Sequence, residues 1–240
     1  MNKKYIGNKL EHYKKIDLIQ SEIPIRVEQK KIGNKIEHYK IIDSTQSEKS
    51  IRVEQNKIGN KIEHYKEIDS TQLEIHRRIE QNNIENGLII IADKQTNGKG
   101  THGRIWHTDE DNNIAFSLYI ETDCKYQKLD GITIEIAKII LRVFKNLYQI
   151  NLQIKEPNDI VYNGKKIGGI LTESKILKDK VKYLVIGIGI NTNKQQFPED
   201  IKNIATSIKK EFNINIDNML IIKQFCKEFE KHLISKNILI

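Results

Sequence analysis

Three glycines, two cationic side chains and the only tryptophan of the chain lie together in the segment from Gly98 to Trp106. Glycines lack a Cβ atom, so backbone N–H groups can approach an anion closely there. Lys99 and Arg104 add full positive charges, and the indole of Trp106 can cover an apolar ring or a base. The segment therefore predicts a loop that binds a phosphorylated or adenylated ligand.

The same glycines match the spacing Gly-x-Gly-x-x-Gly of a dinucleotide-binding loop, and Glu121 lies near the distance expected of a ribose-binding acid. A dinucleotide site, however, needs a helix that begins directly after the glycines, because the N-terminus of that helix holds the pyrophosphate. Here the chain continues through residues 104–108 into a polar turn and a predicted strand. The sequence therefore argues against a Rossmann site.

A further cation is predicted on a rigid strand. Asn163-Gly164 between two apolar runs is typical of a two-residue hairpin turn. Such a turn would pair Tyr162 with Lys165 and Val161 with Lys166, and the two glycines that follow would leave Lys166 room to reach a ligand. The alternative interpretation is an exposed cation on an edge strand.

The elements that position these residues follow from the hydrophobic pattern. It predicts strands at 62–68, 88–92, 113–120 and 183–191, and helices at 131–147 and 217–233. In the strand at 183–191, isoleucines take one face while Gly187 and Gly189 take the other, which leaves space for a ligand against the backbone. Thr71 to Glu74 fit a capping box at the start of another helix.

The first third of the chain is a tandem repeat whose copies begin at Gly7, Gly33 and Gly59, 26 residues apart. A solenoid would continue this period, but the repeat stops near Asn82. Only the third copy is contiguous with the predicted strand and glycine loop. We therefore expect residues 1–56 to be surplus copies, loosely ordered or packed on the surface, and residues 57–240 to form the folded domain.

Composition indicates a globular protein of 240 residues with a formal net charge of +8. This charge admits nucleic acid or an acidic protein as a partner, but it is weak evidence for either because the lysines are spread along the chain. Cys124 and Cys226 form no metal motif, and the position of Cys226 on an apolar helix stripe indicates core packing. The sequence shows no segment for a membrane or for secretion, which predicts a cytoplasmic enzyme.

Four segments, taken in order, resemble the catalytic domain of biotin protein ligases, also called biotin–[acetyl-CoA-carboxylase] ligases. They are Asp69-Ser70-Thr71, then Gln95 with residues 98–106, then residues 155–173, then residues 187–191. The resemblance implies an α+β fold with a mixed, largely antiparallel sheet flanked by helices. It also implies a ligase that activates biotin with ATP and Mg²⁺ to biotinyl-AMP. Biotin would then pass to a lysine of a biotin carboxyl carrier protein of the acetyl-CoA or pyruvate carboxylase type.

The resemblance assigns a role to individual residues. Biotin binding falls to Ser70, Thr71, Gln72, Gln95, Lys99, Gly100, Thr101 and Lys166. Nucleotide binding falls to Lys99, Arg104, Trp106, Lys155, Asn158, Asp159 and Asn191, with Asp159 also the candidate Mg²⁺ ligand. Lys166 is the expected catalytic residue, because it would neutralise both the biotin carboxylate and the α-phosphate. For Ser70 and Thr71 the alternative interpretation is a plain helix cap.

The chain departs from the family at several points. Lys99 and Thr101 stand where the family usually has arginine, and Glu156 stands where it has tryptophan. We expect no C-terminal β-barrel and no winged-helix DNA-binding domain, and a homodimer is possible. Two other functions stay open: a lipoate or octanoate transferase of the same superfamily, and a degenerate, non-catalytic biotin-binding protein.

Overall fold

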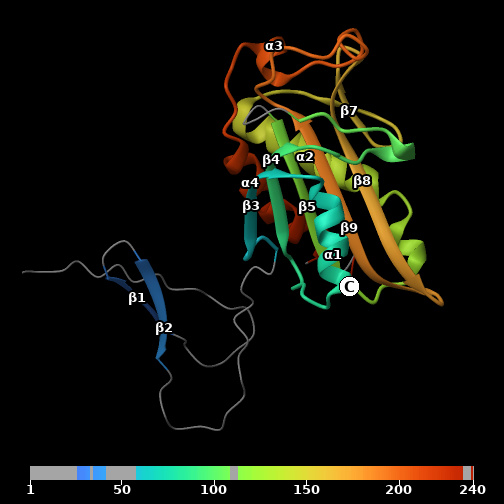
Figure 1. Cartoon of the computed structure of the whole chain (residues 1–240). Coiled ribbons are helices and arrows are strands. Elements are labelled where there is room, and N and C mark those ends of the chain that lie inside the picture. Colours follow the sequence, from blue (N-terminus) through green and yellow to red (C-terminus); the bar gives the residue numbers. More distant parts are fainter. Residues whose placement is uncertain (1–25, 33–34, 42–57, 109–112, 235–238, 240) are drawn as a thin grey trace, which may run out of the picture. The chain divides into compact units, whose positions relative to one another are not determined.

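The computed structural model describes residues 26–32, 35–41, 58–108, 113–234 and 239 of the chain. The chain divides into two units between Val53 and Glu54. In the first unit, β1 (Arg26–Ile32) and β2 (Lys35–Ile41) form an antiparallel pair (Figure 1). The predicted looseness of the surplus copies concerns mostly residues outside the described ranges, and it stays a prediction.

The second unit contains a sheet of seven strands in the order β3-β4-β5-β9-β8-β7-β6. The strands are β3 (Ile62–Ile68), β4 (Ile89–Gln95), β5 (Asn113–Glu121), β6 (Gln153–Lys155), β7 (Asp159–Tyr162), β8 (Lys165–Leu177) and β9 (Lys180–Asn191). Only the β3–β4 pair is parallel, and the other neighbours in this sheet are antiparallel. The predicted mixed, largely antiparallel α+β sheet is confirmed.

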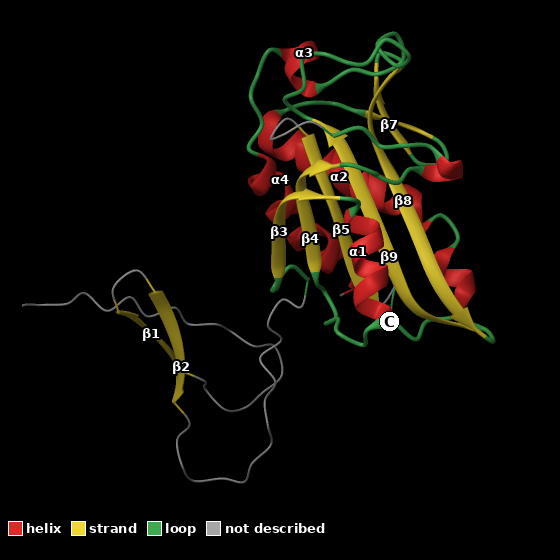
Figure 2. Cartoon of the chain, viewed as in Figure 1, coloured by secondary structure: helices red, strands yellow, loops and turns green. Residues whose placement is uncertain are grey.

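Helices cover both faces of this sheet (Figure 2). The helices of this unit are α1 (Thr71–Glu80), α2 (Ile132–Tyr148), α3 (Ile208–Phe212) and α4 (Asn218–Phe229), of which α1 lies on one face and α2 and α4 on the other. Short 3-10 turns η1 (Thr101–Gly103) and η2 (Tyr126–Leu129) and a π-helical segment η3 (Glu230–Ile234) complete the helical elements of the described ranges. None of the helices in the described ranges has both the length and the apolar character that crossing a bilayer requires.

The two faces of the sheet carry cores of different size. Alternating residues of β5 and β9, such as Phe116 and Ile188, pack with α2 and α4 in the larger core. On the other face, Ile75 of α1 packs with a smaller cluster that includes Leu88 and Val185. Since side chains of a strand alternate between faces, the residues beside Val185 on this second face are Gly187 and Gly189. The small core ends there, which leaves the sheet open beyond α1.

The start of α1 differs from the prediction. The helix is capped by Ser70, whose Oγ accepts a hydrogen bond from the backbone N–H of Leu73 at 3.5 Å, and not by Thr71. Glu74 does not close a capping box, because its carboxylate accepts hydrogen bonds from Arg77 at 2.8 Å and Arg78 at 2.7 Å. The predicted capping box at Thr71 is therefore wrong. Because Thr71 is the first helical residue, its hydroxyl is available to other partners.

The predicted hairpin is confirmed. Val161 lies opposite Lys166 and Tyr162 opposite Lys165, with Asn163 and Gly164 at φ 48° and 77° in the turn. Positive φ at both turn residues is the geometry that matches strand twist. The backbone of Lys166 is also fixed from its other side, since its N–H donates to the carbonyl of residue 204 at 2.8 Å.

Candidate active site

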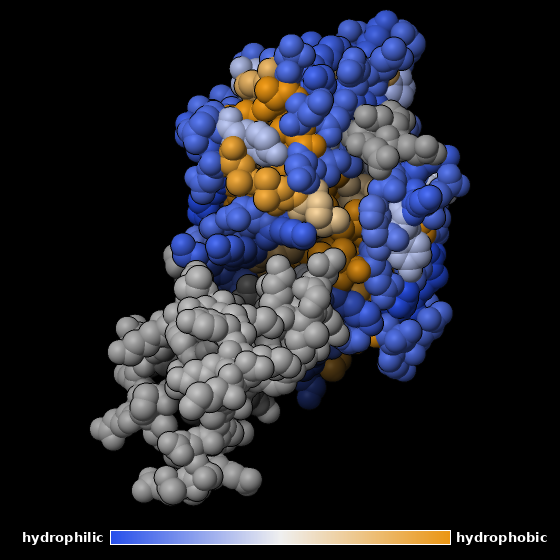
Figure 3. Space-filling view, turned by 90° about the vertical axis from the view of Figure 1, so that its left-hand side faces the viewer, coloured by the Kyte–Doolittle hydropathy of each residue, from blue (hydrophilic) through white to orange (hydrophobic). Residues whose placement is uncertain are grey.

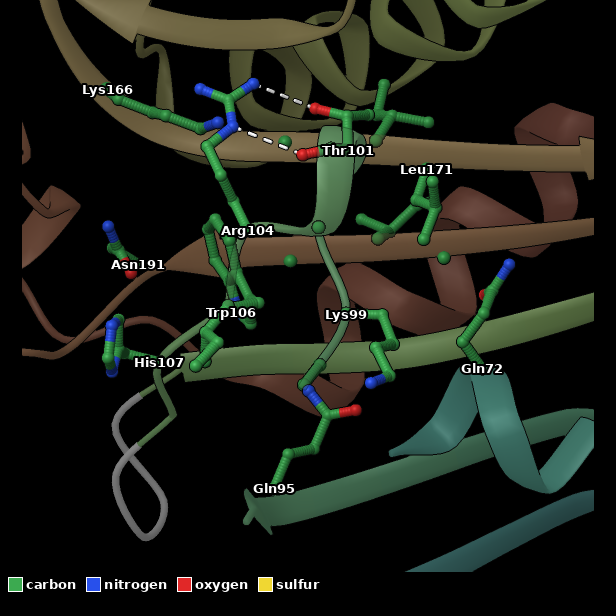
Figure 4. A pocket seen from close by; sticks show the side chains of 18 of the residues that line it. Gln72, Gln95, Lys99, Thr101, Arg104, Trp106, His107, Lys166, Leu171 and Asn191 are labelled. Atoms are coloured by element: carbon green, nitrogen blue, oxygen red, sulfur yellow. Dashed lines mark hydrogen bonds between the residues drawn. The ribbon is translucent and has the colours of Figure 1, made fainter. Parts of the chain in front are cut away.

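A cavity of about 440 Å³ opens on the glycine-bearing face of the sheet, beyond the N-terminus of α1. Its walls come from the start of α1, the loop around η1, and strands β5, β8 and β9 (Figure 4). Most of the predicted site residues line it: Ser70, Thr71, Gln72, Gln95, Lys99, Gly100, Thr101, Arg104, Trp106, Asn158, Lys166 and Asn191. The structure thus brings together residues from four separate segments of the sequence.

Two predicted residues are not among those that line this cavity. Lys155 is exposed on β6, the edge strand of the sheet. Asp159 lies at the start of β7 and contacts Lys166, with 2.6 Å between its Oδ1 and the Lys166 Nζ. Asp159 therefore acts on the cavity through Lys166, whereas the predicted contact of Lys155 with nucleotide finds no support in the cavity lining.

The end of the cavity next to α1 is polar and buried. The backbone N–H of Thr71 donates to Oε1 of Gln95 at 2.8 Å, which holds that amide in one orientation. The hydroxyl of Thr71 lies 2.9 Å from that of Ser117, which has no exposed surface. Buried polar groups are costly unless they are hydrogen-bonded. This cluster therefore forms a rigid set of donors and acceptors that a polar ring could contact.

The glycine loop folds back on itself as a tight bend. The N–H of Trp106 donates to the carbonyl of Gly98 at 2.9 Å, and the N–H of Gly100 donates to the carbonyl of Arg104 at 2.8 Å. A Cβ atom at Gly98 would lie 2.4 Å from the Trp106 carbonyl oxygen, so only glycine allows this approach. The bend holds the indole of Trp106 against β9, where a Cβ at Gly189 would lie 2.2 Å from the ring.

Arg104 takes up the space beside Thr101. Its Nη2 donates to the Thr101 hydroxyl at 2.9 Å and its Nε to the Thr101 carbonyl at 3.2 Å (Figure 4). The amide of Asn158 reaches the same hydroxyl at 3.5 Å. Position 101 therefore lacks the arginine that the resemblance predicts there. The guanidinium of Arg104 lies beside Thr101 instead.

Cations dominate the end of the cavity near this loop. Lys99, Arg104 and Lys166 line it together with Lys194, which is 3% exposed. The Nζ of Lys166 also lies 5.9 Å from the centre of the Trp106 ring. Charges in a partly buried site act more strongly than they do in water. This end of the cavity is therefore suited to phosphate and carboxylate oxygens.

A resident metal does not fit the described residues. Among them, no group of three or more His, Cys, Asp or Glu side chains could hold an ion. The predicted magnesium ligand, Asp159, is paired with Lys166. Mg²⁺ is commonly bound through one or two carboxylates together with substrate phosphates. Asp159 alone is not such a group, and the Mg²⁺ site stays a prediction.

Several residues of the cavity were not expected from the sequence. Ser117 is the polar residue inside the apolar run of β5, and this interruption is the signal that could have identified it. Lys194 follows the end of β9 and carried no comparable signal. Two exposed apolar side chains, Ile105 and Ile204, also line the cavity.

The surface of this unit carries apolar patches among polar residues, as the face drawn in Figure 3 shows. Cys226 is not part of the surface: it is buried in the core, as predicted.

Comparison with known proteins agrees with this geometry. The bifunctional ligase/repressor BirA of Bacillus subtilis is 40% identical over 147 residues, which is 60% of this chain and 45% of that protein. The biotin–[acetyl-CoA-carboxylase] ligase of Mycobacterium tuberculosis is 28% identical over 62% of this chain and 54% of its own length. The chain thus spans about half the length of these relatives.

Solved structures show the same fold. The biotin protein ligase of Aquifex aeolicus in complex with biotin and ATP matches with a TM-score of 0.59 and 28% identity, over 75% of this chain and 70% of that one. The biotin protein ligase of Leishmania major in complex with biotinyl-5-AMP matches with a TM-score of 0.57 and 25% identity, over 75% and 80%. The family model described as biotin/lipoate A/B protein ligase matches residues 65–191. Since this match covers more than half of the sequence, the chain belongs to the biotin/lipoate A/B protein ligase family.

Proposed function

We propose that this chain is a biotin protein ligase, which joins biotin to ATP as biotinyl-AMP and passes the biotinyl group to a lysine of a biotin carboxyl carrier protein. The observation that carries this proposal is the arrangement of the cavity, with a buried polar cluster at one end and a cationic glycine loop at the other. Biotin has the matching arrangement, because it carries a polar ureido ring at one end and a carboxylate at the other.

The ureido ring would bind at the buried end. Thr71, Gln95 and Ser117 offer hydroxyl and amide groups whose positions are set by the hydrogen bonds between them. The apolar part of biotin would lie against the glycine face of β9, beside Leu171 of β8, which lies opposite Gly187. Groups held in place before binding lose less freedom when the ligand arrives. The same site would hold the ring in one orientation and direct the carboxylate toward the loop.

The first chemical step would take place beside Lys166. A carboxylate oxygen of biotin attacks the α-phosphorus of ATP, and pyrophosphate leaves. Both reactants are anionic, so the ammonium group of Lys166 lowers their repulsion and stabilises charge that develops on the phosphoryl oxygens. Its ion pair with Asp159 holds Nζ in place. Lys99 and Arg104 would contact phosphate, and the indole of Trp106 would cover adenine.

In the second step the amine of the carrier lysine attacks the carbonyl carbon of the biotinyl group, and AMP leaves. The exposed apolar side chains Ile105 and Ile204 at the cavity would shield this reactive anhydride from water. Mg²⁺ would enter with ATP, on its phosphate oxygens. The kind of carboxylase that supplies the carrier, and a homodimer of this chain, stay predictions.

Biotin-dependent exchange of label between ATP and pyrophosphate tests the proposal directly. The parent should catalyse exchange with biotin but not with lipoate or octanoate. Replacing one preorganised charged donor commonly costs about 10²–10³ in rate, so Lys166→Gln should slow exchange by that factor. Lys165→Gln is the matched control, because Lys165 is the exposed neighbour and is not part of the cavity lining. A sensitive Lys165, or exchange that depends on lipoate, would contradict the assignment.

A further inference from the structure

A continuous chain of hydrogen bonds runs from the surface to the polar end of the cavity. The carboxylate of Glu173, on β8, accepts from the Nε2 of Gln72 at 2.7 Å. The Oε1 of Gln72 accepts from the hydroxyl of Ser117 at 2.9 Å, and that hydroxyl lies 2.9 Å from the Thr71 hydroxyl. Gln72, Ser117 and Thr71 are 4%, 0% and 3% exposed. We call these four residues the polar relay.

The relay has one direction because a carboxylate can only accept hydrogen bonds. Glu173 therefore requires the amide nitrogen of Gln72 on its side, and the Gln72 oxygen must face Ser117. Ser117 has one hydroxyl proton, which it donates to Gln72, so toward Thr71 it offers only lone pairs. The Thr71 hydroxyl then has two acceptors for its one proton, the Ser117 oxygen at 2.9 Å and Oε1 of Gln95 at 3.2 Å, and the shorter contact favours Ser117.

Two contacts keep Gln72 in this orientation. Its Nε2 also lies 3.4 Å from the carbonyl oxygen of Val185, a second acceptor that would repel the amide oxygen if the group turned over. Its Oε1 packs against β9 so closely that a Cβ at Gly187 would lie 2.7 Å from it. The contact of Glu173 with the buried amide therefore fixes the direction of the Gln72–Ser117 hydrogen bond, although Glu173 itself does not line the cavity.

His76 keeps the end of the relay charged. Its Nε2 lies 2.8 Å from the same oxygen of Glu173 that Gln72 contacts. Hydrogen bonds from His76 and Gln72 lower the pKa of Glu173 although part of its surface is buried. The contact with Glu173 raises the pKa of His76, and the nearby charge of Glu80 acts in the same direction. Near neutral pH, Glu173 is an ionised acceptor.

We propose that Glu173 is a positioning residue that sets the direction of the polar relay and thereby selects ligands that carry a ring N–H group. With its proton committed to Ser117, Thr71 Oγ1 presents lone pairs to the cavity. A ureido N–H can donate to them, whereas the sulfur atoms of a dithiolane ring bring no donor. This inference rests on the proposed function and names what separates biotin from lipoate in the same cavity.

Calorimetric titration of the full chain with biotin tests the relay. Glu173→Gln keeps the shape of the side chain but can also donate, so the direction of the relay is lost, and biotin should bind about tenfold more weakly. Ser117→Ala breaks the next link and should weaken biotin binding to a similar extent. The double variant should bind no more weakly than the weaker single variant, because both changes act on one chain of contacts.

Three measurements separate positioning from a general loss of structure. The KM for biotin should rise in Glu173→Gln while the KM for ATP, kcat and the melting temperature keep their parent values. Glu228→Gln is the matched control: it removes the same charge from α4, on the opposite face of the sheet. Parent affinity in Glu173→Gln, or additive losses in the double variant, would overturn the relay alone. A parent chain that does not bind biotin would overturn the proposed function and this inference with it.

Discussion

The second and third copies of the N-terminal repeat have nearly the same sequence but are used differently. Residues 36–40 and 62–66 both read Ile-Glu-His-Tyr-Lys, and both segments form strands. In the second copy, β2 pairs antiparallel with β1, whereas in the third copy β3 pairs parallel with β4 at the edge of the large sheet. Local sequence therefore specifies a strand in both places, and the rest of the fold determines its partner.

The second copy also repeats the candidate ligand-binding residues Ser70, Thr71 and Gln72. Its residues 43–46 read Asp-Ser-Thr-Gln, like residues 69–72 of the third copy. What it lacks is the buried face of α1, since Lys49 stands where the third copy has Ile75. Ile75 has no exposed surface and packs under the helix. The two copies therefore differ in the residue that packs under α1 and not in these candidate residues.

The largest expected effect comes from giving the third copy the lysine of the second. Ile75→Lys would place an unpaired ammonium among Leu88, Ile90 and Val185. Such a change should lower the free energy of unfolding by about 4 kcal/mol or more, because the charge is neither hydrated nor paired. Urea denaturation measures it, with Ile75→Val as the control at about 0.5–1.5 kcal/mol. A loss below that of the valine variant would show that the packing of α1 does not distinguish the copies.

The first copy suggests the next change, since it has Pro24 where the third copy has His76. Position 76 lies inside α1. Proline there removes a backbone hydrogen bond and crowds the carbonyl of Gln72, at a cost of about 3 kcal/mol or more. His76→Pro should therefore destabilise the protein by this amount, as measured by thermal denaturation. His76→Ala removes the same side chain but keeps the backbone hydrogen bond of α1, so it should destabilise the protein less. Equal decreases in stability in both variants would contradict the expectation.

A smaller effect is expected at position 77, where the second copy has Ile51. Arg77 donates to both carboxylate oxygens of Asp69 at 2.8 Å and lowers the pKa of Asp69 to about 2. Both side chains are about two-fifths exposed, at 41% and 37%. Arg77→Ile should therefore cost only about 0.5–1 kcal/mol near pH 7.

The sign of its pH dependence follows from the lowered pKa of Asp69. The ion pair stabilises the fold above the ordinary pKa of 3.8, and this contribution is lost as the pH falls toward about 2. Between pH 3.8 and about 2, the difference in the free energy of unfolding between the parent and Arg77→Ile should therefore fall toward zero. Urea denaturation at successive pH values measures this difference. Lys145→Ile, which removes an exposed cation from α2, should show no such convergence. A constant difference between parent and Arg77→Ile would contradict the assignment.

The smallest effect is expected from removing the first two copies of the repeat, which we predict to be surplus. Every residue that lines the cavity lies between Ser70 and Ala205. Deleting residues 2–56 should therefore change the free energy of unfolding by less than about 0.5 kcal/mol and leave biotin-dependent exchange at the parent rate. A truncated protein that is folded but does not form the adenylate would show that the repeats contribute to function.

Much of the fold could be predicted because its signals are local. The sequence predicted β3 with the bounds that the structure has, and Asn163-Gly164 predicted the turn that places Lys166. Glycines on one face of β9 predicted the open surface where the cavity lies. The capping box at Thr71 could not be judged in this way. Ser70 and Thr71 have similar capping chemistry, and the choice between them depends on partners from other strands.

By itself, the sequence predicted a loop of glycines and cations for phosphate, and its resemblance to a family predicted hydroxyls and amides for a ring. These properties belong to single side chains and to spacings of a few residues. Only the tertiary structure decided that Glu173, 101 residues away from Gln72 along the chain, accepts a hydrogen bond from the Gln72 amide. It also decided that Asp159 contacts Lys166, and that Lys155 lies outside the cavity lining. The reason is physical: the direction of a hydrogen bond and the partner of a charge depend on atoms that the fold brings together from distant strands.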